Sequence, residues 1–246
     1  THLYDTVFPT GARNEKQHWV VVPEEQTEYP FQGDVVFSND KVIVVLRKSG
    51  AGAEIYTRNR SGIAVKQAVL SPITEDRGQV FHQFSIRKNM LDGIVVDALI
   101  SSPGKPASGI QLELLVGQNF VKVQALGPIK ALRVEAPSEF VVLPDFFADD
   151  IVIAAADLPD GSFELPSENF LLNFSHAGES IVMNVWDNRD QDIRVISGKS
   201  NASSAIQATE ITFGHEGSIW VSILAEPGIW HKRDIKLSDK DRIIPL

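Results

Sequence analysis

Apolar and polar residues alternate with a period of two along nearly the whole chain, which constrains the fold more than any other feature. The pattern is clear at Ile110–Val116 and Val121–Ala125, and it returns at Ile181–Val185 and Ile219–Ile223. A β-strand places successive side chains on opposite faces, so each run predicts a strand with one face in a core. Turn-forming residues separate the runs, and no alternation of strands with helices is present. The sequence therefore predicts an all-β fold, a large antiparallel β-sandwich.

Three stretches are apolar without alternation, namely Val42–Leu46, Ile94–Ile100 and Ile151–Ala156. Continuous apolar runs of this length are typical of central strands that are covered on both faces. Helical signals are weak, and single turns are expected only at Asp145–Asp150 and Ser238–Arg242.

The best internal boundary is the segment Pro159–Pro166, which reads Pro-Asp-Gly-Ser-Phe-Glu-Leu-Pro. It predicts a large β-sandwich domain over residues 1–158. Residues 167–246 then form either a second, smaller β lobe or a continuation of the same sandwich. The chain begins at Thr1, as expected after removal of an export leader or trimming of a longer chain. Arg242–Leu246 resembles the start of a strand, which suggests a longer parent chain.

The chain of 246 residues has a net charge of -9, an acidic pI of about 5.1 and no cysteine. An acidic field repels phosphate backbones, so nucleic acid is not expected as a partner. Membrane insertion is not expected either, because no apolar run approaches the roughly 20 residues of a spanning helix. The absence of cysteine excludes disulfides, thiolate nucleophiles and zinc–thiolate sites.

No decisive catalytic motif is present, whether a phosphate-binding glycine loop, a G-x-S-x-G elbow or an H-E-x-x-H pair. Carboxylates are frequent, but their spacing selects no pair for glycoside hydrolysis. A polysaccharide lyase would use a tyrosine, histidine or lysine base. The three tyrosines, Tyr4, Tyr29 and Tyr56, lie far in sequence from most of the histidines. The sequence leaves open whether the protein is an enzyme.

Two segments resemble each other around a histidine. Phe174–Ile181 and Phe213–Ile219 both lead from phenylalanine through His-x-Gly to Ser-Ile. Phe37–Val42 is a looser third case, and the simpler interpretation is three β-hairpins with similar turns. The alternative is a duplicated unit that places His176 and His215 on one edge, where they are candidate catalytic residues or, with a third histidine, metal ligands.

Asp187, Asp190 and Asp192 form an oxygen-rich cluster after Trp186, and oxygen ligands are what calcium requires. The cluster lacks the glycine and distal glutamate of an EF-hand loop, and Arg189 in its middle opposes a cation. A solvated hairpin is the simpler interpretation. We therefore expect no cofactor, with calcium as the alternative.

The tryptophans suggest a ligand. Trp220 faces away from its apolar neighbours on a predicted strand, and Trp230 lies in a turn-rich loop beside His231 and Glu226. An exposed indole with polar neighbours suits a sugar, because sugar C–H groups stack on the ring while hydroxyls form hydrogen bonds. The four residues are therefore candidate glycan contacts. The alternative is that the rings pack under loops or between the sheets.

The run Asp34–Leu46, the glycine-rich turn after it and Ala53–Tyr56 resemble the opening hairpin of galactose-mutarotase-like supersandwich domains. Leu112–Val123 resembles a later part of the same domains, and the resemblance covers about residues 30–155. It implies a supersandwich fold of the kind found in secreted bacterial glycan-active enzymes, as catalytic or accessory unit. The family's catalytic histidine and glutamate have no matching positions here, so mutarotase activity is not implied.

These observations favour a carbohydrate-binding or accessory β-sandwich module of an exported glycan-processing protein, secreted or periplasmic, with a glycan or polysaccharide as partner. One alternative is a polysaccharide lyase or glycoside hydrolase. Another is a structural cell-envelope or assembly protein whose exposed strand edges pair with other subunits. The sequence sets no oligomeric state.

Overall fold

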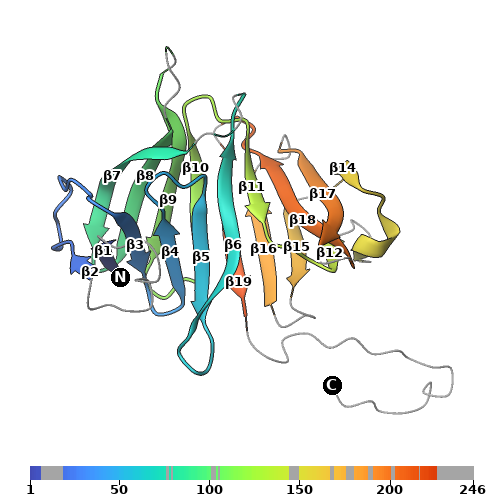
Figure 1. The fold of residues 1–246 in the computed structure, drawn as a ribbon, viewed down its shortest axis with the longest axis horizontal. Coiled ribbons are helices and arrows are strands. Elements are labelled where there is room, and N and C mark those ends of the chain that lie inside the picture. The colour runs from blue at the N-terminus through green and yellow to red at the C-terminus, as the bar shows by residue number, and fades with distance from the viewer. Residues whose placement is uncertain are drawn as a thin grey trace.

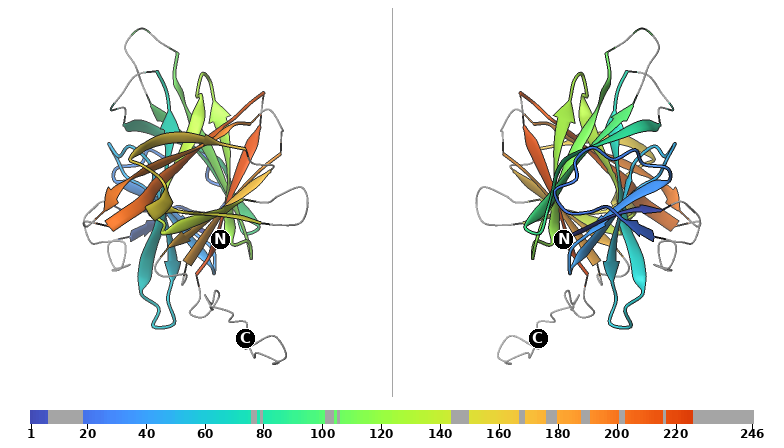
Figure 2. Two further views of the ribbon diagram at one scale, coloured as in Figure 1. Left: turned by 90° about the vertical axis from the view of Figure 1, so that its right-hand side faces the viewer. Right: turned by 90° about the vertical axis from the view of Figure 1, so that its left-hand side faces the viewer.

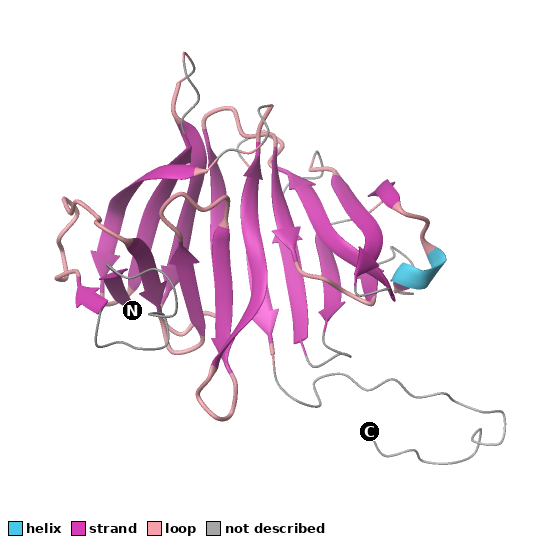
Figure 3. Ribbon diagram, in the orientation of Figure 1, coloured by secondary structure: helices cyan, strands magenta, loops and turns pink. Residues whose placement is uncertain are grey.

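The computed structural model describes residues 1–225 except 7–18, 76–77, 79, 101–103, 105, 144–149, 167–168, 176–179, 188–190, 201–202 and 216. Within this part of the chain, a ten-stranded and a nine-stranded antiparallel sheet pack face to face (Figures 1 and 3). The predicted all-β antiparallel sandwich is therefore confirmed.

The ten-stranded sheet, here sheet A, has the order β14-β17-β18-β11-β6-β5-β4-β3-β1-β2. Its strands are β1 (His2–Thr6), β2 (Trp19–Val21), β3 (Asp34–Ser38), β4 (Val42–Leu46), β5 (Ala53–Arg58), β6 (Ala64–Ile73), β11 (Ala131–Glu135), β14 (Gly161–Leu165), β17 (Ile193–Ser200) and β18 (Ser203–Thr212).

The nine-stranded sheet, here sheet B, has the order β13-β12-β15-β16-β19-β10-β9-β8-β7. Its strands are β7 (Phe81–Met90), β8 (Gly93–Ile100), β9 (Ser108–Leu115), β10 (Phe120–Leu126), β12 (Phe140–Leu143), β13 (Ile151–Ala154), β15 (Phe170–Ser175), β16 (Ser180–Trp186) and β19 (Ser218–Leu224).

Strands from both sides of the segment 159–166 share both sheets. β17 and β18 extend sheet A beyond β11, and β19 lies between β10 and β16 in sheet B. The boundary itself stays a prediction. Part of its segment forms β14, which is the last strand of sheet A in the described part of the chain.

The alternating residues fill one core between the sheets. Val44, Leu112 and Val221 are fully buried there with many other aliphatic side chains. Two smaller apolar clusters lie apart from this core. One groups Tyr4 and Trp19 with residues of β3–β5, and the other centres on Phe174 of β15.

Of the three continuous apolar runs predicted to form central strands, two do so and one does not. β4 is buried at every position and β8 at most of its positions, as central strands should be. β13, from the run Ile151–Ala156, instead lies at the end of sheet B, and among the described strands it pairs with β12 alone. Its Ile151 and Val152 are 43% and 59% exposed. Apolar composition alone does not separate a central strand from an apolar edge strand.

Phe213–Ile219 is not a hairpin, which corrects the simpler interpretation of that segment. β18 before it pairs with β11 and β17 in sheet A, whereas β19 after it pairs with β10 and β16 in sheet B. The turn therefore carries the chain from one sheet to the other. The hairpin expectation is right for the strands on either side of the other two segments, since β15 pairs with β16 and β3 pairs with β4.

The helical turns expected at Asp145–Asp150 and Ser238–Arg242 lie outside the described residues except for Asp150. One 3-10 turn is present in the described part, at Ala155–Asp157 (Figure 3). No described helix has the length and apolar character needed to cross a membrane.

Candidate functional site

The segment between β2 and β3, residues 22–33, lies across one end of the sandwich and is called the strap here (Figure 2, right). It has no strand pattern of its own, and its side chains include the aromatic pair Tyr29 and Phe31. Val22 at its start is buried in the main core. The strap thus closes the open end between β1–β3 of sheet A and β7 of sheet B.

Asp5 on β1 anchors the second half of the strap to sheet A. Its carboxylate accepts hydrogen bonds from the backbone N–H of Gln32 and of Gly33, both at 2.9 Å, and from the hydroxyl of Tyr29 at 3.3 Å. Asp5 is only 1% exposed, so these donors replace the water that a carboxylate requires. The position of Tyr29 follows from this anchor.

A second set of contacts anchors the first half of the strap to β7. The backbone N–H of Glu25 donates to the carbonyl of Asn89 at 2.8 Å, and the Asn89 amide donates to the carbonyl of Pro23 at 2.7 Å. The Glu24 carboxylate accepts from the backbone N–H of Leu91 at 3.0 Å. The strap is therefore bonded to both sheets.

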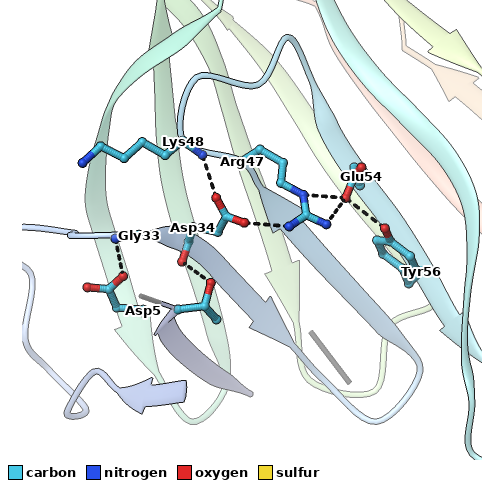
Figure 4. Close-up of polar contacts among 8 residues, drawn as sticks. Asp5, Gly33, Asp34, Arg47, Lys48, Glu54 and Tyr56 are labelled. Carbon is cyan, nitrogen blue, oxygen red and sulfur yellow. Dashed lines mark hydrogen bonds and ion pairs between the residues drawn. The ribbon is translucent and has the colours of Figure 1, made fainter. Parts of the chain in front are cut away.

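Next to the strap, Asp34 and Arg47 fix the turn that follows β4 (Figure 4). Arg47 Nη1 lies 2.7 Å from Asp34 Oδ2, and Arg47 Nη2 lies 3.0 Å from Glu54 Oε2. Asp34 also accepts from the backbone N–H of Lys48 at 2.9 Å. Burial opposes the charge on Arg47, but the hydrogen bond to Asp34 and the charges of Glu54 and Asp34 outweigh it and raise the pKa of Arg47.

The strap, the β4–β5 turn and β7 enclose a cavity of about 210 Å³, called the strap pocket here. Phe31 meets Tyr29 edge to face with ring centroids 5.1 Å apart, and it meets Phe84 of β7 at 6.4 Å. These three rings line the pocket and pack against the main core. Aromatic rings therefore form these walls of the pocket, and the main core packs behind them.

The remaining lining of the strap pocket is polar. Lys48 comes from the β4–β5 turn, while His82 and Gln83 are exposed side chains of β7. The Lys48 ammonium donates to the carbonyl of Gln32 at 3.1 Å, which holds it beside the strap. The described lining contains no carboxylate, whereas glycoside hydrolysis requires two. Aromatic faces beside an amide, an imidazole and an ammonium favour binding of a hydroxylated ring.

Tyr29 should titrate late in an alkaline titration. Burial, and then the charge and hydrogen bond of Asp5, raise the pKa of Tyr29 above the usual 10.0. Because the folded pKa is the higher one, the stability that Tyr29 contributes is complete below the unfolded pKa and is lost as pH rises through the folded value. In Tyr29→Phe, the alkaline titration followed by tyrosinate absorbance should lose one late component. The free energy of unfolding of this variant should also change less with pH in the alkaline range than that of the wild type.

That assignment needs a second variant, because burial also raises the pKa of Tyr4. Tyr4→Phe should remove the late component that belongs to Tyr4 and leave the one from Tyr29 in place. An unchanged late titration in Tyr29→Phe would show that contact with Asp5 does not raise the pKa of Tyr29.

Some residues singled out in the sequence lie elsewhere. Trp220 of β19 is half-buried outside the main core, with Lys122 Nζ 5.8 Å from its ring centroid. His215 is exposed in the crossover turn between the sheets. Outside the described residues lie His176, Asp190, Glu226, Trp230 and His231.

The candidate calcium residues are partly described. Asp187 accepts from the backbone N–H of Ser218 at 3.1 Å, and Asp192 donates its backbone N–H to Thr212 Oγ1 at 2.7 Å. No group of three or more histidine or acidic side chains able to hold a metal ion occurs among the described residues. Calcium stays an alternative, because Asp190 is not among them.

The strap pocket itself was missed from the sequence. Tyr29, Lys48 and His82 lie on three segments that only the folded sandwich brings together. One signal was available: Asp5 follows the apolar pair Leu3–Tyr4 and Asp34 directly precedes the apolar run Val35–Phe37, and a carboxylate buried beside such residues needs donors from elsewhere in the fold.

No protein-family model and no curated protein matches the chain. Among solved structures, the α-N-acetylgalactosaminidase NagBb from Bifidobacterium bifidum, in complex with Gal-NHAc-DNJ, is similar with a TM-score of 0.49 and 7% identity. The match covers 77% of this chain and 36% of that one, so this chain spans about a third of its length. A match at this level assigns neither a family nor an activity.

Proposed function

We propose that this protein is a carbohydrate-binding β-sandwich module that holds one sugar ring of a glycan in the strap pocket. The observation that carries the proposal is the lining of that pocket, with the rings of Tyr29, Phe31 and Phe84 beside polar groups on Lys48, His82 and Gln83. Sugar C–H groups pack on aromatic rings while hydroxyls bond to such polar groups.

The size of the strap pocket restricts the ligand. Its volume of about 210 Å³ is smaller than the roughly 300–1,000 Å³ of pockets that enclose drug-sized molecules. A single ring fits that space, so the module binds a chain end or a side branch rather than the middle of a polysaccharide. The proposed setting is the one expected from the sequence, an exported glycan-processing protein.

Gln83→Ala and His82→Ala should each weaken glycan binding about two- to tenfold. Each change removes roughly one ligand hydrogen bond, which contributes about 0.5–1.5 kcal/mol, and about 1.4 kcal/mol corresponds to tenfold in Kd. Both side chains are exposed, so the fold should be unaffected. Isothermal titration calorimetry against neutral hexoses, N-acetylhexosamines and uronic acids gives the affinities.

Gln124→Ala is the matched control. Gln124 lies on β10, three strands from β7 in the same sheet, and does not line the strap pocket. Its replacement should leave the affinity unchanged. The proposal is overturned if none of the sugars binds, or if the Gln124 variant loses as much affinity as the Gln83 variant.

A polysaccharide lyase is a second candidate function, because the strap pocket brings Tyr29, His82 and Lys48 together. A lyase needs a base, a proton donor and a cation that neutralises a uronate carboxylate. The Tyr29 hydroxyl is protonated near neutral pH, as a proton donor must be, and its proton lies in the hydrogen bond to Asp5. Release of unsaturated uronate products by the wild type, lost in His82→Ala, would select this function over binding alone.

A further inference from the structure

The interior of the sandwich is polar at one end, unlike the aliphatic core elsewhere. Asn173 of β15, Asn184 of β16 and Thr209 of β18 are each 0% exposed. Asn184 Nδ2 donates to Asn173 Oδ1 at 2.9 Å, and Asn173 Nδ2 donates to Thr209 Oγ1 at 3.2 Å. Because Asn173 belongs to sheet B and Thr209 to sheet A, these side chains form a polar bridge between the sheets.

A second polar bridge lies nearby. Ser180 Oγ of sheet B donates to Gln67 Oε1 of sheet A at 2.6 Å, and Gln67 Nε2 donates to Thr57 Oγ1 at 2.9 Å. Gln67 stands at a bulge in β6, where the pairing with β5 shifts by one residue. The bulge explains how a glutamine that interrupts the apolar positions of β6 reaches toward the other sheet.

Three buried side-chain oxygens of the described residues lack hydrogen bonds. Ser175 Oγ, Asn184 Oδ1 and Ser197 Oγ have no partner among the described residues. Ser175 is 3% exposed and Ser197 is 5% exposed. Unsatisfied buried polar atoms are few in native proteins and each destabilises the fold, so such an atom next to a cavity indicates a bound molecule or water.

Ser175 also lines a cavity of about 490 Å³ that opens through sheet A, called the notch here. β11 separates β6 from β18 only as far as Glu135, and the chain then continues to β12 of sheet B. Beyond that point no strand of the described residues lies between β6 and β18. Lys66 and Gln67 line the notch on the β6 side and Gln207 on the β18 side.

The charges around the notch balance. Arg133 Nη1 lies 3.1 Å from Glu210 Oε1, and Arg133 Nε lies 3.2 Å from Glu135 Oε1 in an ion pair that is not aligned as a hydrogen bond. Lys66 adds one further positive charge, so two cations face two carboxylates. These side chains therefore carry no net charge that would attract an ion, and they present both hydrogen-bond donors and hydrogen-bond acceptors to a ligand.

We propose that the notch binds a small neutral polyol, one hydroxyl of which bonds to Ser175 Oγ. A hydroxyl donates and accepts at once, which suits a site formed by a serine, two glutamines and paired charges. The space exceeds that of the strap pocket, and the two cavities share no lining residue. This site is therefore independent of the proposed function.

Ser175→Ala tests the site with xylitol and D-glucose as probes. Wild type should bind at least one of them saturably in calorimetry and in ligand-observed NMR, and Ser175→Ala should weaken that binding at least tenfold. In the absence of ligand the variant should melt at a higher temperature, because it loses an unsatisfied buried hydroxyl. Melting alone is not the readout for the ligand, since polyols also stabilise proteins by exclusion from their surface.

Ser197→Ala is the matched control, because it removes an equally buried, unpartnered hydroxyl that does not line the notch. It should raise the melting temperature and leave polyol binding unchanged. Binding at the notch should also survive Gln83→Ala, which separates it from the strap pocket. Absence of saturable polyol binding, equal affinity in Ser175→Ala, or binding of sulfate in place of the polyols would overturn the proposal.

Discussion

Replacing Arg47 by methionine is expected to lower the free energy of unfolding by about 3 kcal/mol, near the lower end of the 3–5 kcal/mol lost when one partner of a buried ion pair is removed. Asp34 is 1% exposed and would keep the backbone N–H of Lys48 as donor but lose its counter-charge. Glu54 would lose the same guanidinium. Urea-induced unfolding at neutral pH measures the difference.

Arg194→Met provides the comparison for this effect. Arg194 and Glu164 form an ion pair at 2.7 Å, the same distance as Arg47 and Asp34, but their side chains are 46% and 74% exposed. Exposed pairs contribute about 0–1 kcal/mol, so this variant should unfold almost like the wild type. Equal losses in the two variants would show that burial does not determine the contribution of Arg47.

Asp5→Ala is expected to lower the free energy of unfolding by about 3 kcal/mol and to abolish glycan binding. Hydrogen bonds to a charged group contribute about 1.5–3 kcal/mol each, and the backbone N–H groups of Gln32 and Gly33 would lose their acceptor. Tyr29 would lose its partner as well, so two of the three aromatic walls would no longer be held. Chemical unfolding and calorimetry measure the two effects.

Asp5→Asn separates the two effects of that change. Its side-chain carbonyl keeps one acceptor for the strap without the negative charge, so it should retain part of the stability and part of the affinity. Full glycan affinity in Asp5→Ala would show that the strap does not form the binding site, whatever happens to stability.

Much of the fold could be predicted from the period of the apolar residues, because the apolar positions of each strand show which of its two faces is buried. Val121 and Val123 are buried while Lys122 between them is not, as their alternation predicts. The order of the strands could not be predicted, since the sequence of a strand does not specify which other strand it pairs with. The crossover at Phe213–Ile219 was mistaken for a hairpin for this reason.

The candidate sites were harder to predict than the strands. The strap pocket depends on Asp5, which accepts hydrogen bonds from backbone N–H groups 27 and 28 residues further along the chain. The notch depends on where β11 ends relative to β6 and β18, which is a property of the folded sheet. Sequence reasoning instead favoured tryptophans and histidines by residue type, and most of those lie outside the described residues.

The place of β19 in sheet B has a consequence for how the protein is made. Ser218–Leu224 pairs with β10 on one side and β16 on the other, although it follows both in the chain. Until Leu224 has left the ribosome, the strand that lies between β10 and β16 is missing, so each of them lacks a partner on that side. Such edges invite pairing between molecules, and pairings distant in sequence form slowly. The last described strand to be synthesised thus joins the two parts of sheet B.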